Sequence, residues 1–117
     1  MYIGDYLEDE PYEEWALLRR EGLKDIYLII LSKLADYSLK AADYESCICY
    51  SQKILAKDPF REDTYRRLMY CYSRLGQRNR AIRWYELCQK TFKGELDAAP
   101  DNETTKLYNK MLKNEIL

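Results

Sequence analysis

Two consecutive stretches decide the fold of this chain: LIILSKLADYSLKAADYESCICYSQKILAKDPFR at residues 28–61 and EDTYRRLMYCYSRLGQRNRAIRWYELCQKTFKGE at residues 62–95. They read as one helical hairpin written twice, because a shift of 34 residues places apolar on apolar and small on small residues. The shift pairs Leu34 with Leu68, Cys47 with Ala81, Ile48 with Ile82, Tyr50 with Trp84, and Ile54 with Cys88. A single hairpin of this kind cannot bury its apolar face, so the two are predicted to stack and to share one core.

The whole pattern predicts an all-α, tetratricopeptide-like bundle in which residues 11–95 form the stacked hairpins. Five helices are expected, at residues 11–40, 43–57, 59–75, 78–93 and 101–112. Asp43, Asp58 and Asp101 are expected to cap the second, third and fifth helices at their N-termini. Gly76 and Gly94 are expected to end the third and fourth helices in the left-handed conformation.

The segments that flank the hairpins are interpreted as parts docked on them. Residues 1–10 are predicted to form an acidic lead-in, held as an ordered strap by Tyr6 and Leu7. Residues 96–117 are predicted to form a loop and a helix outside the 34-residue register, which we read as a cap over the last hairpin. Gly22 is read as a point of close packing or a kink in the first helix. Apolar residues recur along that helix at helical spacing: Trp15, Leu18, Ile26, Ile29, Ile30, Leu34 and Tyr37.

The composition argues against several classes of function. The 117 residues carry a net charge of −1, include no histidine, and contain four cysteines without a CxxC pair. Histidine-based catalytic triads and the common zinc spacings are therefore excluded. No GxGxxG, GxxxxGK[ST] or GxSxG motif is present either. We accordingly predict no enzyme activity and no catalytic, cofactor-binding or metal-binding residues.

The cysteines and the N-terminal sequence bear on the cellular location. Cys47, Cys49, Cys71 and Cys88 are read as small buried residues in a reducing cytosol. A disulfide, or a metal site that uses all four thiols, is the alternative. The chain has neither the basic-then-apolar pattern of a signal peptide nor an apolar run of about 20 residues that could span a membrane. A cytoplasmic location without membrane contact is expected.

Charge is distributed unevenly along the chain. Residues 61–93 carry nine basic and three acidic side chains, a net charge of +6, whereas the first fourteen residues carry −6. One interpretation is a solvated face that the acidic segment balances. The other is a docking face for nucleic-acid backbone or for an acidic partner. Its candidate residues are Arg66, Arg67, Arg74, Arg78, Arg80 and Arg83.

Aromatic residues suggest two further candidate sites. Stacked hairpins leave a concave groove that binds peptides or helices in many repeat proteins, and Arg61, Tyr65 and Tyr72 are candidates to line it. The alternative for these tyrosines is a place in the core. Trp15 and Arg19 stand one helical turn apart, where Trp15 is expected to pin the first helix to the bundle.

An ordered set of residues along nearly the whole chain then points to a family. The set is Gly4-Asp5-Tyr6-Leu7, Tyr12, Trp15, Arg19, Leu23, Asp58-Pro59-Phe60-Arg61-Glu62, Leu68-Met69, Gly76, Arg78, Ala81, Tyr85, Pro100, Glu103-Thr104 and Leu107-Tyr108. It closely resembles the bacterial transcriptional activator domain (BTAD) of the SARP family, the Streptomyces antibiotic regulatory proteins.

The resemblance implies a regulatory or activator domain that acts through binding. In the family this domain usually follows a winged-helix DNA-binding domain of the response-regulator type, so the chain is expected to be a C-terminal segment of a transcription factor. It would order the DNA-reading domain, support homodimers on tandem sites, or contact RNA polymerase or DNA phosphates. Trp15 and Arg19 would then lie near the DNA-binding domain. The alternative is a stand-alone tetratricopeptide-like adaptor that binds a peptide or a helix, unrelated to transcription.

Overall fold

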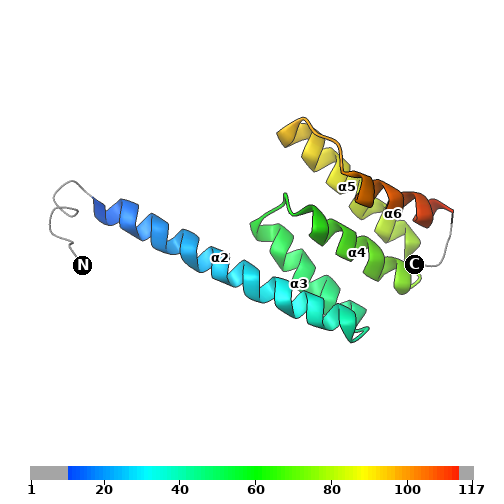
Figure 1. The fold of residues 1–117 in the computed structure, drawn as a ribbon, viewed down its shortest axis with the longest axis horizontal. Coiled ribbons are helices and arrows are strands. Elements are labelled where there is room, and N and C mark those ends of the chain that lie inside the picture. The colour runs from blue at the N-terminus through cyan, green and yellow to red at the C-terminus, as the bar shows by residue number, and fades with distance from the viewer. Residues whose placement is uncertain (1–10, 114–117) are drawn as a thin grey trace.

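The structure, a computed structural model, describes residues 11–113, so the strap predicted at residues 1–10 lies outside the described residues. Within that range the chain is all α-helix, as predicted, and no strand is present (Figure 1). The helices are α2 (Pro11–Lys40), α3 (Tyr44–Lys57), α4 (Glu62–Arg74), α5 (Arg78–Leu96) and α6 (Asn102–Leu112).

The turns inside the two hairpins are copies of each other. Ala42, with a φ of 59°, and Gly76, with a φ of 77°, both take the left-handed conformation, 34 residues apart. In each copy the next amide donates a hydrogen bond of 2.8 Å to the carbonyl five residues back, which is the closure of a Schellman motif. The repeat read from side-chain pattern is therefore also a repeat of backbone conformation.

Burial follows the same register. Six pairs of residues 34 positions apart are buried in both copies: Leu31 and Tyr65, Ala35 and Met69, Ser38 and Tyr72, Cys47 and Ala81, Ser51 and Tyr85, and Ile54 and Cys88. Ala35 belongs to the same core cluster as Leu68 and Met69, so the two hairpins share a core. Leu34 departs from the pattern, because it is 39% exposed whereas its partner Leu68 is 0% exposed.

The prediction that the third helix opens at Pro59 is wrong. Asp58 ends α3, and its carboxylate accepts a hydrogen bond of 3.2 Å from the amide of Phe60 and one of 3.1 Å from Nε of Arg61. This side-chain turn holds Pro59 and Phe60 outside the helix, and α4 begins only at Glu62.

The prediction for Gly94 is also wrong, and one of the two interpretations of Gly22 is excluded. Gly94 lies inside α5, which continues to Leu96, and Asp97 takes the left-handed position instead, with a φ of 50°. Gly22 lies inside the continuous helix α2, and no atom lies within 4 Å of where its Cβ would be, so it does not mark close packing. The predicted caps at Asp43 and Asp101 are confirmed, because these carboxylates accept the amide hydrogens of Ser46 and Thr104.

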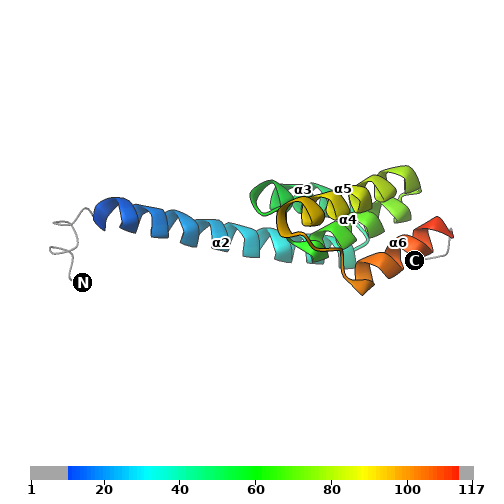
Figure 2. The same cartoon turned by 90° about the horizontal axis from the view of Figure 1, so that it is seen from above.

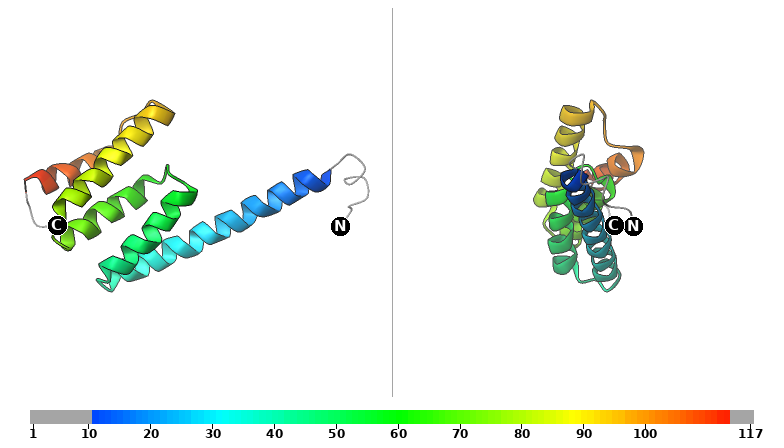
Figure 3. Two further views of the ribbon diagram at one scale, coloured as in Figure 1. Left: turned by 180° about the vertical axis from the view of Figure 1, so that it is seen from behind. Right: turned by 90° about the vertical axis from the view of Figure 1, so that its left-hand side faces the viewer.

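The helices pack in chain order, except that α6 folds back over α4 and α5 (Figures 2 and 3). This position of α6 agrees with its predicted capping role. α2 is much longer than the helix that packs beside it. Its 30 residues span about 45 Å, whereas the 14 residues of α3 span about 21 Å. The N-terminal half of α2 consequently extends beyond the bundle, and the molecule measures 62 × 34 × 18 Å (Figure 1).

Candidate functional site

The six arginines predicted as one docking face have different roles. Arg66, on α4, points at α6, where Nη1 donates to Oγ1 of Thr104 at 3.1 Å and lies 3.5 Å from Oδ1 of Asp101. Its Nη2 lies 3.2 Å from Oε2 of Glu103. Arg66 is therefore a clamp between α4 and α6, and the structure does not leave it free for a partner.

The clamp includes a carboxylate that the sequence analysis did not single out as a site. Glu62 accepts hydrogen bonds from the amide of Asp101 at 2.7 Å and from Oγ1 of Thr104 at 2.5 Å. The amide of Thr104 lowers the pKa of Asp101, and the guanidinium of Arg66 lowers it further. The family-like motifs at residues 58–62 and 100–108 thus meet in space. Their separation in sequence gave no local signal that they would pair.

Two more of the six arginines are engaged in the fold. Arg74 donates from Nε to the hydroxyl of Tyr44 at 3.3 Å and lies 5.8 Å from the centre of its ring. Arg78 donates from Nη2 to the carbonyl oxygen of Leu112 at 2.7 Å, at the C-terminal end of α6. Arg67 is partly buried, and its Nη1 has no hydrogen-bond partner among the described residues.

The remaining two arginines lie on the outer side of α5. Arg80 and Arg83 are exposed, and neither forms an ion pair with any residue of the described range. Helical spacing places them on one face with Leu87 and Lys90, which are also exposed. We call these four residues the α5 basic stripe. Within it, Arg80 and Arg83 are the predicted docking residues that are exposed and make no side-chain hydrogen bond or ion pair within residues 11–113, whereas the equally exposed Arg74 and Arg78 bond to Tyr44 and Leu112.

Two of the three predicted groove residues, Tyr65 and Tyr72, lie in the core, so the groove interpretation of these two is wrong, whereas Arg61 is partly exposed and pairs with Asp58. Tyr65 is 2% exposed, donates its hydroxyl hydrogen to the carbonyl of Pro59 at 2.8 Å, and packs its ring near Trp84. Burial raises the pKa of Tyr65. Tyr72 is 7% exposed, and its hydroxyl accepts a hydrogen bond of 3.3 Å from Nε2 of the Gln52 side chain. Inward-facing rings of this kind present no open surface to a peptide.

Trp15 does not pin the first helix to the bundle. It is 42% exposed, and none of residues 13–27 is buried. The guanidinium carbon of Arg19 lies 5.7 Å from the centre of the Trp15 ring, a cation–π pair along the helix. The pair therefore sits on the part of α2 that extends past α3.

Three of the four cysteines are buried, and all four are free thiols. The prediction is wrong for Cys49, which is exposed. Burial raises the pKa of Cys88 to about 12, and a hydrogen bond to Cys47 raises the pKa of Cys71. The described residues contain no group of three or more metal-ligating side chains. The three buried thiols, Cys47, Cys71 and Cys88, accordingly fill space between helices.

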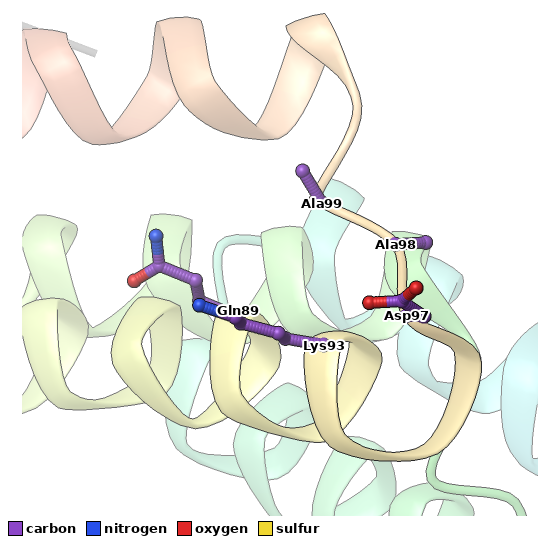
Figure 4. A pocket seen from close by; sticks show the side chains of 5 residues that line it. All are labelled: Gln89, Lys93, Asp97, Ala98 and Ala99. Atoms are coloured by element: carbon purple, nitrogen blue, oxygen red, sulfur yellow. The ribbon is translucent and has the colours of Figure 1, made fainter.

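A surface depression of about 340 Å³ lies where α5 leads into the loop before α6. Gln89 and Lys93 come from α5, and Asp97, Ala98 and Ala99 come from the loop (Figure 4). The set combines one amine, one carboxylate and one amide with two alanines.

Comparison with known families assigns the chain. The sequence matches the family described as bacterial transcriptional activator domain over residues 1–112. The chain therefore belongs to this family, whose domains serve in regulating transcription. No curated protein and no solved structure shows a significant match. Along the described part of the chain, every helix is too short or too polar to cross a bilayer.

Proposed function

We propose that this domain is the regulatory part of a bacterial transcription factor and that it activates transcription by contacting an acidic surface of RNA polymerase. The observation that carries the proposal is the α5 basic stripe. Its arginines are exposed and make neither an ion pair nor a side-chain hydrogen bond within residues 11–113, whereas Arg66, Arg74 and Arg78 of the same hairpin are held by other parts of the fold.

The make-up of the stripe favours a protein partner over DNA. Three cations lie along the same face of α5 as one exposed leucine, Leu87, which is 44% exposed. Protein interfaces combine apolar centres with polar rims and are enriched in arginine. A DNA-backbone surface typically neutralises more phosphates, about 6–10 in strong binders, and gains nothing from an apolar centre.

A second contact is proposed at the other end of the molecule. Trp15 and Arg19 are accessible on the extending half of α2, the part of the chain closest in sequence to a DNA-binding domain that precedes this one. Tryptophan and arginine are the residue types most enriched at binding hot spots. We expect this pair to orient the winged-helix domain relative to the bundle.

The test for the polymerase contact uses the full-length regulator with Arg80→Glu, Arg83→Glu and Lys90→Glu combined. Three charge pairs worth about 0.5 kcal/mol each predict a loss of activated transcription of roughly tenfold. Promoter affinity should stay within about twofold, because the stripe does not touch DNA. The matched control is Lys106→Glu with Lys110→Glu, two exposed lysines on α6.

Two results would contradict this proposal. A parallel loss of promoter affinity would assign the stripe to DNA. The slope of log affinity against log salt concentration should then correspond to about three fewer phosphate contacts. Unchanged transcription and unchanged affinity would remove the stripe from function. The adaptor alternative has lost its main support, because Tyr65 and Tyr72 are buried.

A further inference from the structure

Two of the buried thiols meet at the junction between the two hairpins. Cys47 lies on α3 and Cys71 lies on α4, two helices that pack against each other, and both residues are 0% exposed within one core cluster. The thiol of Cys71 donates a hydrogen bond to the sulfur of Cys47. Because α3 belongs to the first hairpin and α4 to the second, this sulfur pair bridges the two copies of the repeat.

The 34-residue repeat requires a small residue at one of these positions but sulfur at neither. The equivalent of Cys47 in the second hairpin is Ala81, which is also 0% exposed, so an alanine fills the corresponding space. Position 71 corresponds to Tyr37 in α2 and to Thr105 in α6. Packing therefore accounts for a small side chain at position 47, but not for a thiol there that touches a second thiol.

Polar groups around the pair favour the thiolate form of Cys47, which is the nucleophilic form of a cysteine. Its sulfur lies 4.0 Å from Oγ of Ser51. The hydrogen bond from Cys71 is the main cause that lowers the pKa of Cys47 to about 7, against the opposing effect of burial. Ser51 and Arg67 add to this effect, whereas the carboxylate of Asp36 on α2 opposes it. The buried Nη1 of Arg67 has no hydrogen-bond partner among residues 11–113, so its positive charge is left to act on the two sulfurs.

The other two cysteines lack this environment. Cys88 on α5 is as deeply buried, but burial and the charge of Glu62 raise its pKa to about 12, so it stays a neutral thiol. Cys49 is exposed on α3. The chain thus contains a buried thiol and an exposed thiol that serve as internal controls for the pair.

We propose that Cys47 and Cys71 form a redox-modification site whose substrate is a hydroperoxide, hydrogen peroxide in the simplest case, and whose product is a disulfide between α3 and α4. The thiolate of Cys47 attacks one peroxide oxygen, the O–O bond breaks, and hydroxide leaves, so that Cys47 becomes a sulfenic acid. The sulfur of Cys71 then attacks the sulfur of Cys47, the S–O bond breaks, and water leaves with the proton of the Cys71 thiol. The two sulfurs lose two electrons in total, and the peroxide is reduced to two molecules of water.

The burial of the pair sets the rate and the product of this reaction. Both sulfurs are covered, so peroxide reaches them when the junction between α3 and α4 opens locally, and their oxidation is expected to be slower than that of Cys49. The product is a disulfide and not a sulfinic acid, because the second thiol is already in contact. The cross-link closes residues 47–71 into a loop, which stabilises the fold by restricting the unfolded chain. The inference is independent of the polymerase contact, since both thiols lie inside the bundle.

The experiment uses chain 1–117 with Cys49→Ser, which removes the exposed thiol that could link two copies. The reduced protein is treated with hydrogen peroxide, and the remaining thiols are counted by alkylation and mass spectrometry. Two of its three thiols should disappear together, with a peptide pair joined through Cys47 and Cys71, and dithiothreitol should restore both. The midpoint of thermal unfolding should rise by roughly 10 °C on oxidation, because the cross-link restricts the unfolded state.

Single substitutions in the same background separate the roles of the thiols. Cys47→Ala should abolish both the disulfide and the rise in the midpoint, and Ala81 shows that the fold accommodates alanine at the equivalent position. Cys71→Ser should abolish the disulfide but leave a sulfenic acid at Cys47 that dimedone captures. Cys88→Ala is the matched control, a buried cysteine whose removal should leave the disulfide in place.

Three outcomes would overturn the inference. Free thiols at Cys47 and Cys71 after peroxide has oxidised Cys49 in the unsubstituted chain would show that local opening does not expose the pair. A disulfide that includes Cys88 would show that the contact between the two proposed partners does not direct the reaction. A cross-link that forms only in urea, or that lowers the unfolding midpoint, would show that the sulfurs meet outside the native fold. None of these measurements involves transcription, so the α5 basic stripe is judged by its own test.

Discussion

The α2–α3 and α4–α5 hairpins carry the same backbone turn but lie in different surroundings. The second hairpin is covered on both sides, by α3 and by α6, and it supplies most of the buried aromatic side chains. Among residues 11–113 the first hairpin is covered on one side only, and half of its first helix extends past the bundle (Figure 1). The same position in the repeat can therefore be core in one copy and surface in the other, as Leu68 and Leu34 are.

This difference teaches that a repeat register specifies backbone conformation more strictly than burial. The left-handed turn residue and its closing hydrogen bond recur at the same distance in both copies, because they depend on a few neighbouring residues. Whether a side chain is covered depends on which helix arrives from elsewhere. Each of the following predictions tests one part of this contrast.

The largest effect is expected from the pair of equivalent leucines. Leu68→Ala removes a fully buried side chain and should lower the free energy of unfolding by about 3 kcal/mol. Leu34→Ala, at the same position of the first hairpin, should cost less than about 1 kcal/mol in chain 1–117. Urea unfolding followed by circular dichroism at the helical band measures both. Equal costs would mean that Leu34 is as well covered as Leu68.

The next effect concerns the clamp that distinguishes the second hairpin. Arg66→Ala should lower the free energy of unfolding by about 2 kcal/mol, because it leaves Glu62 partly buried without its charged partner. The matched control is Arg83→Ala, an exposed arginine for which a change below about 0.5 kcal/mol is expected.

The part of the fold that Arg66→Ala loosens tests the same clamp. Hydrogen exchange should accelerate first in α6, since Arg66 and Glu62 hold its N-terminal end through Asp101 and Thr104. Faster exchange confined to α2 and α3, with α6 unchanged, would show that the contacts of Arg66 do not hold α6 in place.

The sequence predicted what depends on local spacing and missed what depends on distant contacts. The helices, the caps at Asp43 and Asp101, and the left-handed Gly76 follow from residues within one or two turns. The role of Arg66 does not, because its partner Thr104 lies 38 residues away. The burial of Tyr65 could not be predicted either, since helical spacing alone does not say which side of α4 meets α5. Among the candidate site residues, Arg80 and Arg83 of α5 are exposed and make no ion pair within residues 11–113, and Trp15 and Arg19 are exposed on the N-terminal half of α2.

The smallest effects are expected at the turns that the two hairpins have in common. Ala42→Gly should raise the free energy of unfolding by about 1 kcal/mol, because alanine is strained at a φ of 59° and glycine is not. Gly76→Ala, at the equivalent position, should lower it by about the same amount. No atom lies within 4 Å of the Cβ that this change adds, so the cost would come from the backbone alone.

Gly94 provides the matched control, because it has the same open surroundings but lies inside α5. Gly94→Ala should therefore raise the free energy of unfolding by up to about 1 kcal/mol, the difference in helix propensity between the two residues. The same substitution thus has opposite signs at Gly76 and Gly94, and a thermal unfolding series resolves shifts of about 4 °C for such differences. If both changes destabilised the chain alike, α5 would have to end near Gly94, as the sequence alone suggests, and the left-handed turn at Asp97 would be wrong.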